Sequence, residues 1–247
     1  MTDIAIIGGT GLTRLAQLEV LHREVVATPY GEPSGPLTYG MLSGHEAVFL
    51  PRHGYGHTIP PHRVNYRANL WALKSIGIER VIAIASVGGI REDLEPGWLV
   101  VPDQIVDYTS GRESTYFNGD RVVHAGFTEP YDAGLRALLL AAGKSAGIAV
   151  VDGGVYAATQ GPRLETAAEI NRLENDGCDM VGMTGMPEAG LACELELAYA
   201  TCAVVTNRAA GRGLGPDIHA EIHEHLERGI AQVYALLTAV LPLIPAR

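Results

Sequence analysis

Short apolar runs alternate with longer amphipathic segments along the chain. Runs without internal polar alternation indicate β-strands buried on both faces. The predicted strands cover residues 4–7, 47–50, 80–85, 99–106, 150–157, 180–183 and 201–206. The predicted helices run from near residue 64 to near residue 77 and over residues 132–146, 164–175, 189–198 and 218–241. This alternation predicts an α/β fold with a central mixed, largely parallel β-sheet flanked by helices.

Two connections differ from ordinary short turns. Residues 28–42 are rich in proline and glycine, and we expect a loop there that leads into a hairpin with residues 47–50. Residues 107–126 are polar and irregular, and a connection of that length is usually functional or contacts a partner. We see no internal repeat, linker or low-complexity segment. The chain has 247 residues, of which 47% are hydrophobic, so we expect a single domain over residues 1–247.

The composition narrows the class of partner. A net charge of −10 and a pI of about 5.3 argue against nucleic acid and against anionic membrane surfaces. Cys178, Cys193 and Cys202 form no C-x-x-C pair and lie among apolar residues, which is typical of reduced thiols in a cytosolic protein. The first residues lead directly into a strand, without the basic segment and long apolar run of a signal peptide. We therefore expect a cytoplasmic protein with a small-molecule ligand.

A loop rich in arginine and histidine follows the apolar run at residues 47–50. Glycines and prolines within residues 54–61 exclude a helix or a central strand there. The loop carries Arg52, His53, His57, His62 and Arg63. In an acidic protein this cluster predicts a local anion site, the alternative being a solvated surface loop. The three histidines also raise the alternative of zinc, but no H-E-x-x-H helix or thiolate partner accompanies them, so we expect no metal.

Polar side chains gather at the ends of several predicted strands. They are Thr10, Arg52, His53, Ser86, Thr184 and Asn207, and Glu165 lies in the first turn of a predicted helix. Ligands of such sheets bind at the carboxyl ends of the strands, so we expect one site. The glycine turn at residues 8–11 can bring backbone amides to a phosphate. It lacks the third glycine of a dinucleotide fingerprint and the Gly-Lys-Ser/Thr of a Walker loop.

The residue types at these strand ends suit phosphate and a polar leaving group. Two threonine hydroxyls, an arginine, a histidine and glycine-turn amides can cradle one phosphate. The chain has no G-x-S-x-G nucleophile elbow, so phosphate could itself be the attacking group. Asn207 and Glu165 would suit a leaving group that offers both acceptors and a donor, because an amide donates and a carboxylate accepts.

Several motifs together resemble the trimeric purine nucleoside phosphorylase and methylthioadenosine phosphorylase family. They are Ile6-Ile7-Gly8-Gly9-Thr10-Gly11-Leu12, Arg52-His53-Gly54, His57-Thr58-Ile59, the run from Val64 to Leu73, Gly161-Pro162-Arg163-Leu164-Glu165-Thr166, and Gly182-Met183-Thr184 with Pro187-Glu188. The set covers nearly the whole chain and is specific only in combination. The resemblance implies a nucleoside-phosphorylase fold and pentosyl transfer from a purine to phosphate. It also implies a homotrimer that needs no metal or organic cofactor.

The resemblance also implies a role for individual residues. The phosphate contacts would come from Thr10, Arg52, His53, Ser86 and Thr184. The catalytic residues would be His53, Glu165 and Asn207. The substrate contacts would come from Glu165, Met183, Asn207, Ala209, His219 and Ile222, with His124 reaching into a neighbouring subunit's site. One position departs from the family, because Ala85 stands where the phosphate site has a second threonine.

The positions that would contact the base differ from those of methylthioadenosine phosphorylases, although the first half of the chain resembles those enzymes most. Glu165 and Asn207 stand where 6-oxopurine phosphorylases have a glutamate and an asparagine. A carboxylate accepts from the N1–H of hypoxanthine, and an amide donates toward N7 and O6. The combination implies reversible phosphorolysis of S-methyl-5'-thioinosine to hypoxanthine and 5-methylthioribose 1-phosphate.

Four alternatives remain open from the sequence. A general inosine and guanosine phosphorylase is favoured if a histidine binds a 5'-hydroxyl, and either His219 or His223 could be aligned with that role, unless both lie on a solvated helix face. A methylthioadenosine phosphorylase is less consistent with the base-contacting residues. A hydrolytic nucleosidase would not need phosphate. A non-catalytic nucleotide-binding module would not need both the phosphate-contacting and the base-contacting residues.

Overall fold

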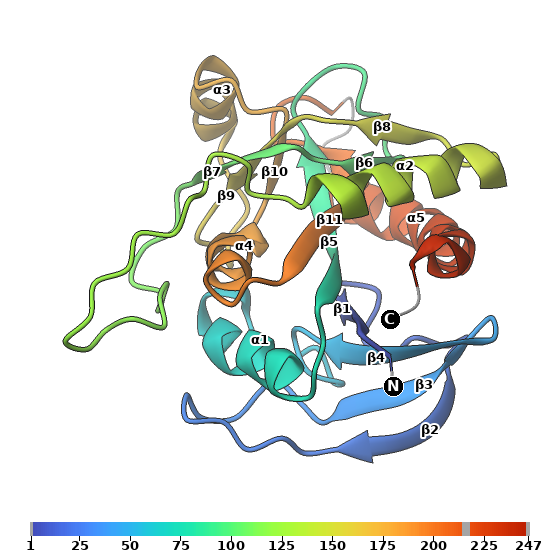
Figure 1. The fold of residues 1–247 in the computed structure, drawn as a ribbon. Coiled ribbons are helices and arrows are strands. Elements are labelled where there is room, and N and C mark those ends of the chain that lie inside the picture. Colours follow the sequence, from blue (N-terminus) through green and yellow to red (C-terminus); the bar gives the residue numbers. More distant parts are fainter. Residues whose placement is uncertain (1, 214–217, 246–247) are drawn as a thin grey trace.

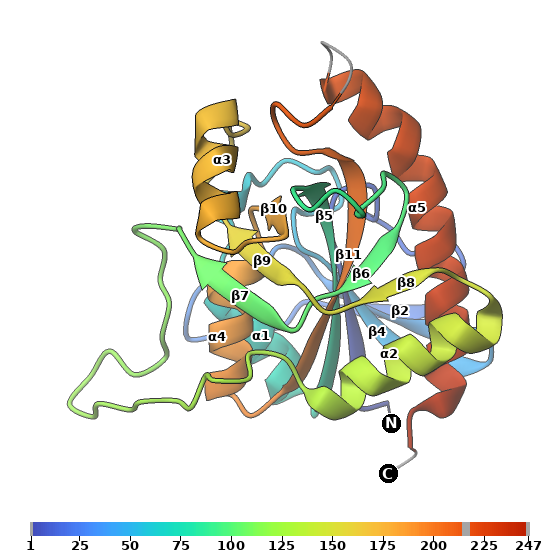
Figure 2. The same cartoon turned by 90° about the horizontal axis from the view of Figure 1, so that it is seen from above.

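The computed structural model describes residues 2–213 and 218–245, without the side chains of residues 218–221, 223 and 224. The described strands form one eleven-stranded mixed sheet, flanked by helices, as the sequence predicts (Figures 1 and 2). The strands are β1 (Ile4–Gly8), β2 (Glu19–Glu24), β3 (Leu37–Leu42), β4 (His45–Pro51), β5 (Arg80–Gly89), β6 (Leu99–Val101), β7 (Gln104–Asp107), β8 (Val150–Asp152), β9 (Val155–Ala158), β10 (Met180–Gly182) and β11 (Ala198–Arg208). The α-helices are α1 (Tyr66–Ser75), α2 (Ala133–Ala146), α3 (Ala167–Asn175), α4 (Gly185–Glu194) and α5 (Ile218–Val240).

The centre of the sheet is built on β5. This strand pairs in parallel with β1 over residues 80–83 and with β11 from end to end, and it pairs antiparallel with β10 at its carboxyl end. The hairpin of β3 and β4 extends the sheet beyond β1, and β2 forms the outer edge there. The expected parallel core and the hairpin at residues 47–50 are therefore confirmed, but the loop expected over residues 28–42 is wrong for residues 37–42, which form β3 and pair with β4.

Alternate residues of β1 face two different hydrophobic cores. Ile4 and Ile6 pack in the core that also contains buried side chains of α2 and α5. Ala5 and Ile7 pack in the core that contains buried side chains of α1 and α4. Because side chains alternate across a strand, the uninterrupted apolar sequence of β1 requires helices on both faces of the sheet.

Two predicted strands are each divided in two, so the predictions over residues 99–106 and 150–157 are wrong as single elements. Pro102, which has no N–H to donate to a ladder, separates β6 from β7. Gly153 (φ 82°) and Gly154 (φ 122°) separate β8 from β9 in conformations that disfavour other residues. The breaks allow β6 and β8 to pair on the β11 side, while β7 and β9 continue the sheet beyond β10.

Other differences concern element boundaries. The helix predicted over residues 164–175 begins only at Ala167, and the helix predicted over residues 189–198 runs from Gly185 to Glu194. Strand β11 continues through Asn207 to Arg208 rather than ending at residue 206. Strand β2 was not predicted, because all six of its residues are exposed and give no burial pattern.

The connection between β7 and α2 contains no helix or strand, which confirms the irregular segment predicted there. In both views this segment extends away from the rest of the molecule (Figures 1 and 2). Its base is anchored, since Glu194 of α4 accepts from the Thr115 hydroxyl at 2.7 Å and from the Tyr116 N–H at 2.8 Å.

Residues 225–243 are long and apolar enough to cross a membrane by length and composition alone. In the structure their apolar side chains Val233, Leu236, Leu237 and Val240 are buried in the core shared with α2. A core helix of this kind needs its apolar residues for packing, so the composition of α5 is explained by its place in the fold.

The first turn of α2 offers a direct test of the local fold. Asp132 caps this helix, and its carboxylate accepts from the Leu135 N–H at 2.6 Å. We expect Asp132→Ala to lower the free energy of unfolding by about 1 kcal/mol, because the N–H loses its partner. Asp132→Ser keeps a capping oxygen and should lose much less. Chemical denaturation of both variants measures the difference, and equal losses would show that the cap contributes nothing.

Candidate functional site

One cavity of about 580 Å³ lies at the carboxyl ends of β1 and β4 and beside β5, β10 and β11. Ten of the residues predicted for the site line it, namely Thr10, Arg52, His53, Ser86, Glu165, Met183, Thr184, Asn207, Ala209 and Ile222. Residues contributed by separate strands and loops thus meet in one place. The sequence-based expectation that Arg52 and Asn207 face a common ligand space agrees with this geometry.

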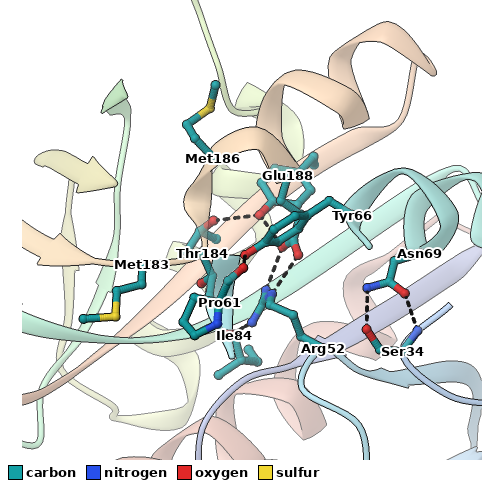
Figure 3. Close-up of polar contacts among 12 residues, drawn as sticks. Ser34, Arg52, Pro61, Tyr66, Asn69, Ile84, Met183, Thr184, Met186 and Glu188 are labelled. Atoms are coloured by element: carbon teal, nitrogen blue, oxygen red, sulfur yellow. Dashed lines mark hydrogen bonds and ion pairs between the residues drawn. The ribbon is translucent and has the colours of Figure 1, made fainter. Parts of the chain in front are cut away.

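Arg52 is held by a buried ion pair with Glu188 of α4 (Figure 3). Its Nε and Nη2 donate to the two carboxylate oxygens of Glu188 at 2.7 and 2.6 Å, and its Nη1 donates to the Ile84 carbonyl at 2.8 Å. Both side chains of the pair are only 1% exposed. Burial by itself would lower the pKa of Arg52, but the adjacent carboxylate raises it above its ordinary value. Arg52 is therefore a fixed cation at the cavity wall.

Glu188 also accepts a hydrogen bond from the Tyr199 hydroxyl at 2.8 Å. The carboxylate therefore has three donors around it, which offset the cost of its burial. The guanidinium still has N–H groups beyond those donated to Glu188 and Ile84, because it carries five. These remaining donors are what an anion in the cavity could use.

His53 is a neutral imidazole at neutral pH. Burial and the nearby charge of Arg52 lower its pKa to about 4. Its Nδ1 lies 2.8 Å from the Ile59 carbonyl, which can only accept, so Nδ1 carries the proton. Nε2 is then left as an acceptor that can take a hydrogen bond from a ligand.

The anion-binding candidates surround the cavity next to Arg52. Thr184 is the N-cap residue of α4, yet its hydroxyl makes no capping bond, and the residue lines the cavity. Thr10 and Ser86 lie close together, with the Ser86 hydroxyl 3.5 Å from the Thr10 carbonyl. Ala85 presents a methyl group to the same wall and supplies no hydroxyl there.

Asn207 is placed by an irregularity in β11. The pairing of β11 with β5 shifts register between Val205 and Asn207, and such bulges redirect side chains near functional sites. The amide Nδ2 donates to the Arg208 carbonyl at 2.7 Å, and the Thr206 hydroxyl donates to Oδ1 at 3.0 Å. The amide is only partly used by these bonds, so one N–H and one acceptor position remain.

Glu165 lies in the loop before α3, not in its first turn as predicted. Its Oε1 accepts from the Thr159 hydroxyl at 2.7 Å. The second carboxylate oxygen has no partner of this kind and is available to a donor in the cavity. Thr166 and Glu169 form the capping box of α3 themselves, so Glu165 is not needed to cap this helix.

One predicted site residue, His124, does not line the cavity. His124 is exposed on the long segment between β7 and α2, and its predicted contact with a neighbouring subunit stays a prediction. The side chain of His219 lies outside the described residues, as does that of His223. Within the described part of the chain, no group of three His, Cys, Asp or Glu side chains is arranged to hold a metal ion.

The sequence did not reveal the contact of Glu188 with Arg52 or that of Arg112 with the Met183 carbonyl. Glu188 appeared only within the motif Pro187-Glu188, and a carboxylate early in a helix is commonly explained by the helix dipole. Arg112 stands in an irregular polar segment without a motif. Both contacts join residues more than 40 positions apart in the chain.

Removing the charge of Glu188 should expose how much the site depends on it. We expect Glu188→Gln to lower the free energy of unfolding by about 3–5 kcal/mol, because the buried guanidinium loses its counter-charge. As a control, Glu174→Gln removes the partner of Arg212 in an exposed pair and should cost less than about 1 kcal/mol. Chemical denaturation compares the two, and similar losses would contradict the buried-pair argument.

The lowered pKa of His53 predicts a pH dependence of stability. Between pH 6.5 and about 4 the unfolded chain binds a proton at this histidine while the native protein does not. The contribution of His53 to the free energy of unfolding therefore falls as the pH falls through this range. Denaturation at pH 5 and pH 7.5 should show a smaller pH effect in His53→Asn than in the original protein. An unchanged pH effect would contradict the assignment.

Comparisons with known proteins agree with this geometry. Residues 3–242 match the family profile described as "Phosphorylase superfamily". A probable S-methyl-5'-thioinosine phosphorylase of Pseudomonas syringae is 54% identical over 98% of this chain and 99% of its own length. A 6-oxopurine nucleoside phosphorylase of Pyrococcus furiosus is 44% identical over 99% of this chain and 94% of its own.

A similar solved structure comes from a more distant relative. A methylthioadenosine phosphorylase of Schistosoma mansoni, solved in complex with adenine, superposes with a TM-score of 0.93 at 32% identity. The superposition covers 98% of this chain and 92% of that one. The fold, the family profile and the relatives lead to one conclusion, which the sequence motifs had indicated: this chain belongs to the phosphorylase superfamily, among its nucleoside phosphorylases.

Proposed function

We propose that the protein catalyses the reversible phosphorolysis of S-methyl-5'-thioinosine, giving hypoxanthine and 5-methylthioribose 1-phosphate. The observation that carries the proposal is that Arg52, Thr184, Glu165 and Asn207 line one and the same cavity. An anion and a purine could face each other there across one sugar. The Pseudomonas relative, named as an enzyme for this substrate, supports the same choice.

The phosphate half of the site combines one fixed cation with neutral donors. The remaining N–H groups of Arg52 and the hydroxyls of Thr10, Ser86 and Thr184 would hold the anion. His53 would accept a hydrogen bond at Nε2 from the protonated oxygen of phosphate, since its Nδ1–H is committed to Ile59.

The base half suits a 6-oxopurine. Such a purine presents acceptors at N7 and O6 and a donor at N1–H. The unused N–H of Asn207 would donate toward N7 or O6, and the free oxygen of Glu165 would accept from N1–H. A 6-aminopurine offers a donor where O6 was and no N1–H, so it would leave buried groups unpaired. Met183 would lie under the ribose, between the two halves.

The reaction would proceed by positioning and electrostatic stabilisation. As the N-glycosidic bond lengthens, the sugar gains positive charge at C1' and the purine gains negative charge. Phosphate would stabilise the sugar cation and then bond to C1', while Asn207 and Glu165 would stabilise the departing purine. No covalent enzyme intermediate is required, and phosphate would be a co-substrate in a reaction without metal or organic cofactor.

The 5' end of the nucleoside decides between the methylthio substrate and the runner-up, a general 6-oxopurine nucleoside phosphorylase. Ile222 of α5 lines the cavity, and its apolar side chain suits a methylthio group better than a hydroxyl. The Pyrococcus relative is named a 6-oxopurine nucleoside phosphorylase, which supports this second function. We also propose a cytoplasmic homotrimer, in which His124 would reach a neighbouring site.

A substrate panel at fixed phosphate tests the proposal. We expect S-methyl-5'-thioinosine to give the highest kcat/KM, ahead of inosine and of S-methyl-5'-thioadenosine, and turnover to stop when phosphate is removed. Preference for inosine would favour the general phosphorylase. Turnover without phosphate would favour a hydrolase, and absence of turnover with every nucleoside would favour a binding module.

The base assignment can be tested at Asn207. Asn207→Asp replaces the amide with a group that, when protonated, donates to N7 and accepts from a 6-amino group. We expect the preference for methylthioinosine over methylthioadenosine to fall about 10- to 100-fold, because leaving a buried polar group unpaired costs about 1–3 kcal/mol of binding free energy. Asn171→Asp on the exposed face of α3 is the matched control. An unchanged preference in Asn207→Asp would refute the assignment.

A further inference from the structure

Arg112 joins the long segment between β7 and α2 to two loops of the cavity. It lies near the base of that segment and is half-buried. Its guanidinium is stacked on the ring of Tyr66, with Cζ 5.6 Å from the ring centroid. Figure 3 shows Tyr66 near the turn that carries Met183, Thr184 and Met186. Arg112 itself does not line the cavity.

The guanidinium of Arg112 donates to four backbone carbonyls. Nη1 donates to Met183 at 2.9 Å and to Met186 at 2.6 Å. Nη2 donates to Gln160 at 2.9 Å and to Thr159 at 3.2 Å. Two of these carbonyls, of Thr159 and Gln160, belong to the loop after β9. The other two belong to the segment after β10, Met183 in the turn itself and Met186 in the first turn of α4, so Arg112 joins two separate segments. One planar cation thus fixes the spacing between them, in a geometry that the ammonium of a lysine cannot reproduce.

The Gln160 side chain strengthens the same junction. Its Oε1 accepts from Nε of Arg112 at 3.2 Å and from the Ser110 N–H at 3.0 Å. The loop after β9 is thereby bonded to the long segment through both its backbone and a side chain.

Each of the two loops carries residues of the proposed site. The segment after β10 holds Met183, whose own carbonyl Arg112 binds, and Thr184, which lies between the two bound carbonyls in the chain. The loop after β9 leads to Glu165, and the Thr159 hydroxyl holds the Glu165 carboxylate at 2.7 Å. A short chain of contacts therefore runs from Arg112 through Thr159 to the carboxylate proposed to face the purine N1–H.

We propose that Arg112 is a positioning residue for base recognition: by fixing the carbonyls of the two loops, it sets the orientation of Glu165 relative to Asn207. This inference rests on the proposed function. Asn207 is placed by the sheet, through the bulge in β11, whereas Glu165 stands on a loop. The distance between them across a purine therefore depends on how the loop is held. A displacement of about 1 Å is enough to weaken a catalytic or recognition contact.

The loss of Arg112 should therefore change the discrimination between purines rather than the rates for all nucleosides alike. If Glu165 is released, the contact to N1–H weakens, and the site loses part of its advantage for a 6-oxopurine over a 6-aminopurine. A purely structural arginine would instead lower the stability or the active fraction, which changes the rates for both nucleosides by the same factor.

The test compares Arg112→Met and Arg112→Lys with a matched control, Arg136→Met. Arg136 is also a half-buried arginine that donates to backbone carbonyls, those of Val101 and Pro102, but it lies away from the cavity. The readouts are kcat/KM for methylthioinosine and for methylthioadenosine, the two nucleoside KM values, and thermal unfolding of each variant.

We expect the ratio of the two kcat/KM values to fall about tenfold in Arg112→Met, as for the loss of about 1.4 kcal/mol of selective binding. The ratio for Arg112→Lys should lie between those of Arg112→Met and the original protein, and the nucleoside KM values should rise in both Arg112 variants. Arg136→Met should keep the original ratio even if it unfolds at a lower temperature. If Arg112→Met does not fold, the lysine variant carries the comparison.

The outcomes separate the two proposals. An unchanged ratio in folded Arg112 variants of an active enzyme would overturn the positioning role and leave the proposed function intact. An equal fall in Arg136→Met would also overturn it, because general destabilisation would then explain the effect. If the original protein phosphorolyses neither nucleoside, the proposed function fails, and the inference falls with it.

Discussion

The buried pair of Arg52 and Glu188 is the interaction on which the site depends. Taking two charges out of water costs several kcal/mol for each ion, and only close hydrogen-bonded contact offsets that cost. The two-point contact, the Ile84 carbonyl and the Tyr199 hydroxyl supply it. The pair also links the loop after β4 to α4, so the cation at the cavity wall and the helix that begins at Thr184 are held in one geometry. A phosphate site with a preformed cation needs little reorganisation when its anion arrives.

The topology of the sheet explains why two kinds of chemistry share one cavity. Strand β5 pairs in parallel with β1 and β11 and also antiparallel with β10. The glycine turn after β1 and the loop after β4 bring Thr10, Arg52 and His53, which we propose bind the anion, to the cavity. Strands β10 and β11 bring Thr184 and Asn207, and the loop after β9 brings Glu165. The division of β6 from β7 and of β8 from β9 lets the chain supply strands on both sides of β5.

Polar residues behind the cavity restrict how the base-facing groups can turn. Thr206 and the Arg208 carbonyl fix the amide of Asn207, and Thr159 fixes the carboxylate of Glu165. Fixed donors and acceptors discriminate between purines more strongly than mobile ones, because a mismatched base leaves a buried group unpaired. The substrate proposal and the positioning role of Arg112 both follow from this requirement. The membership of the chain in the phosphorylase superfamily fits the same arrangement.

The sequence by itself determined the α/β alternation, the two-faced burial of β1 and β5, and the gathering of polar residues at strand ends. These features follow from local periodicity and from the rule that parallel strands place their carboxyl ends together. Boundaries that depend on long-range pairing were missed, such as the breaks at Pro102 and Gly153 and the exposed edge strand β2. Only the tertiary structure decided that Glu188 would neutralise Arg52 and that Arg112 would bind two loops. The partners in these contacts are far apart in the chain, so no local pattern records them, and the packed fold alone brings them within hydrogen-bonding distance.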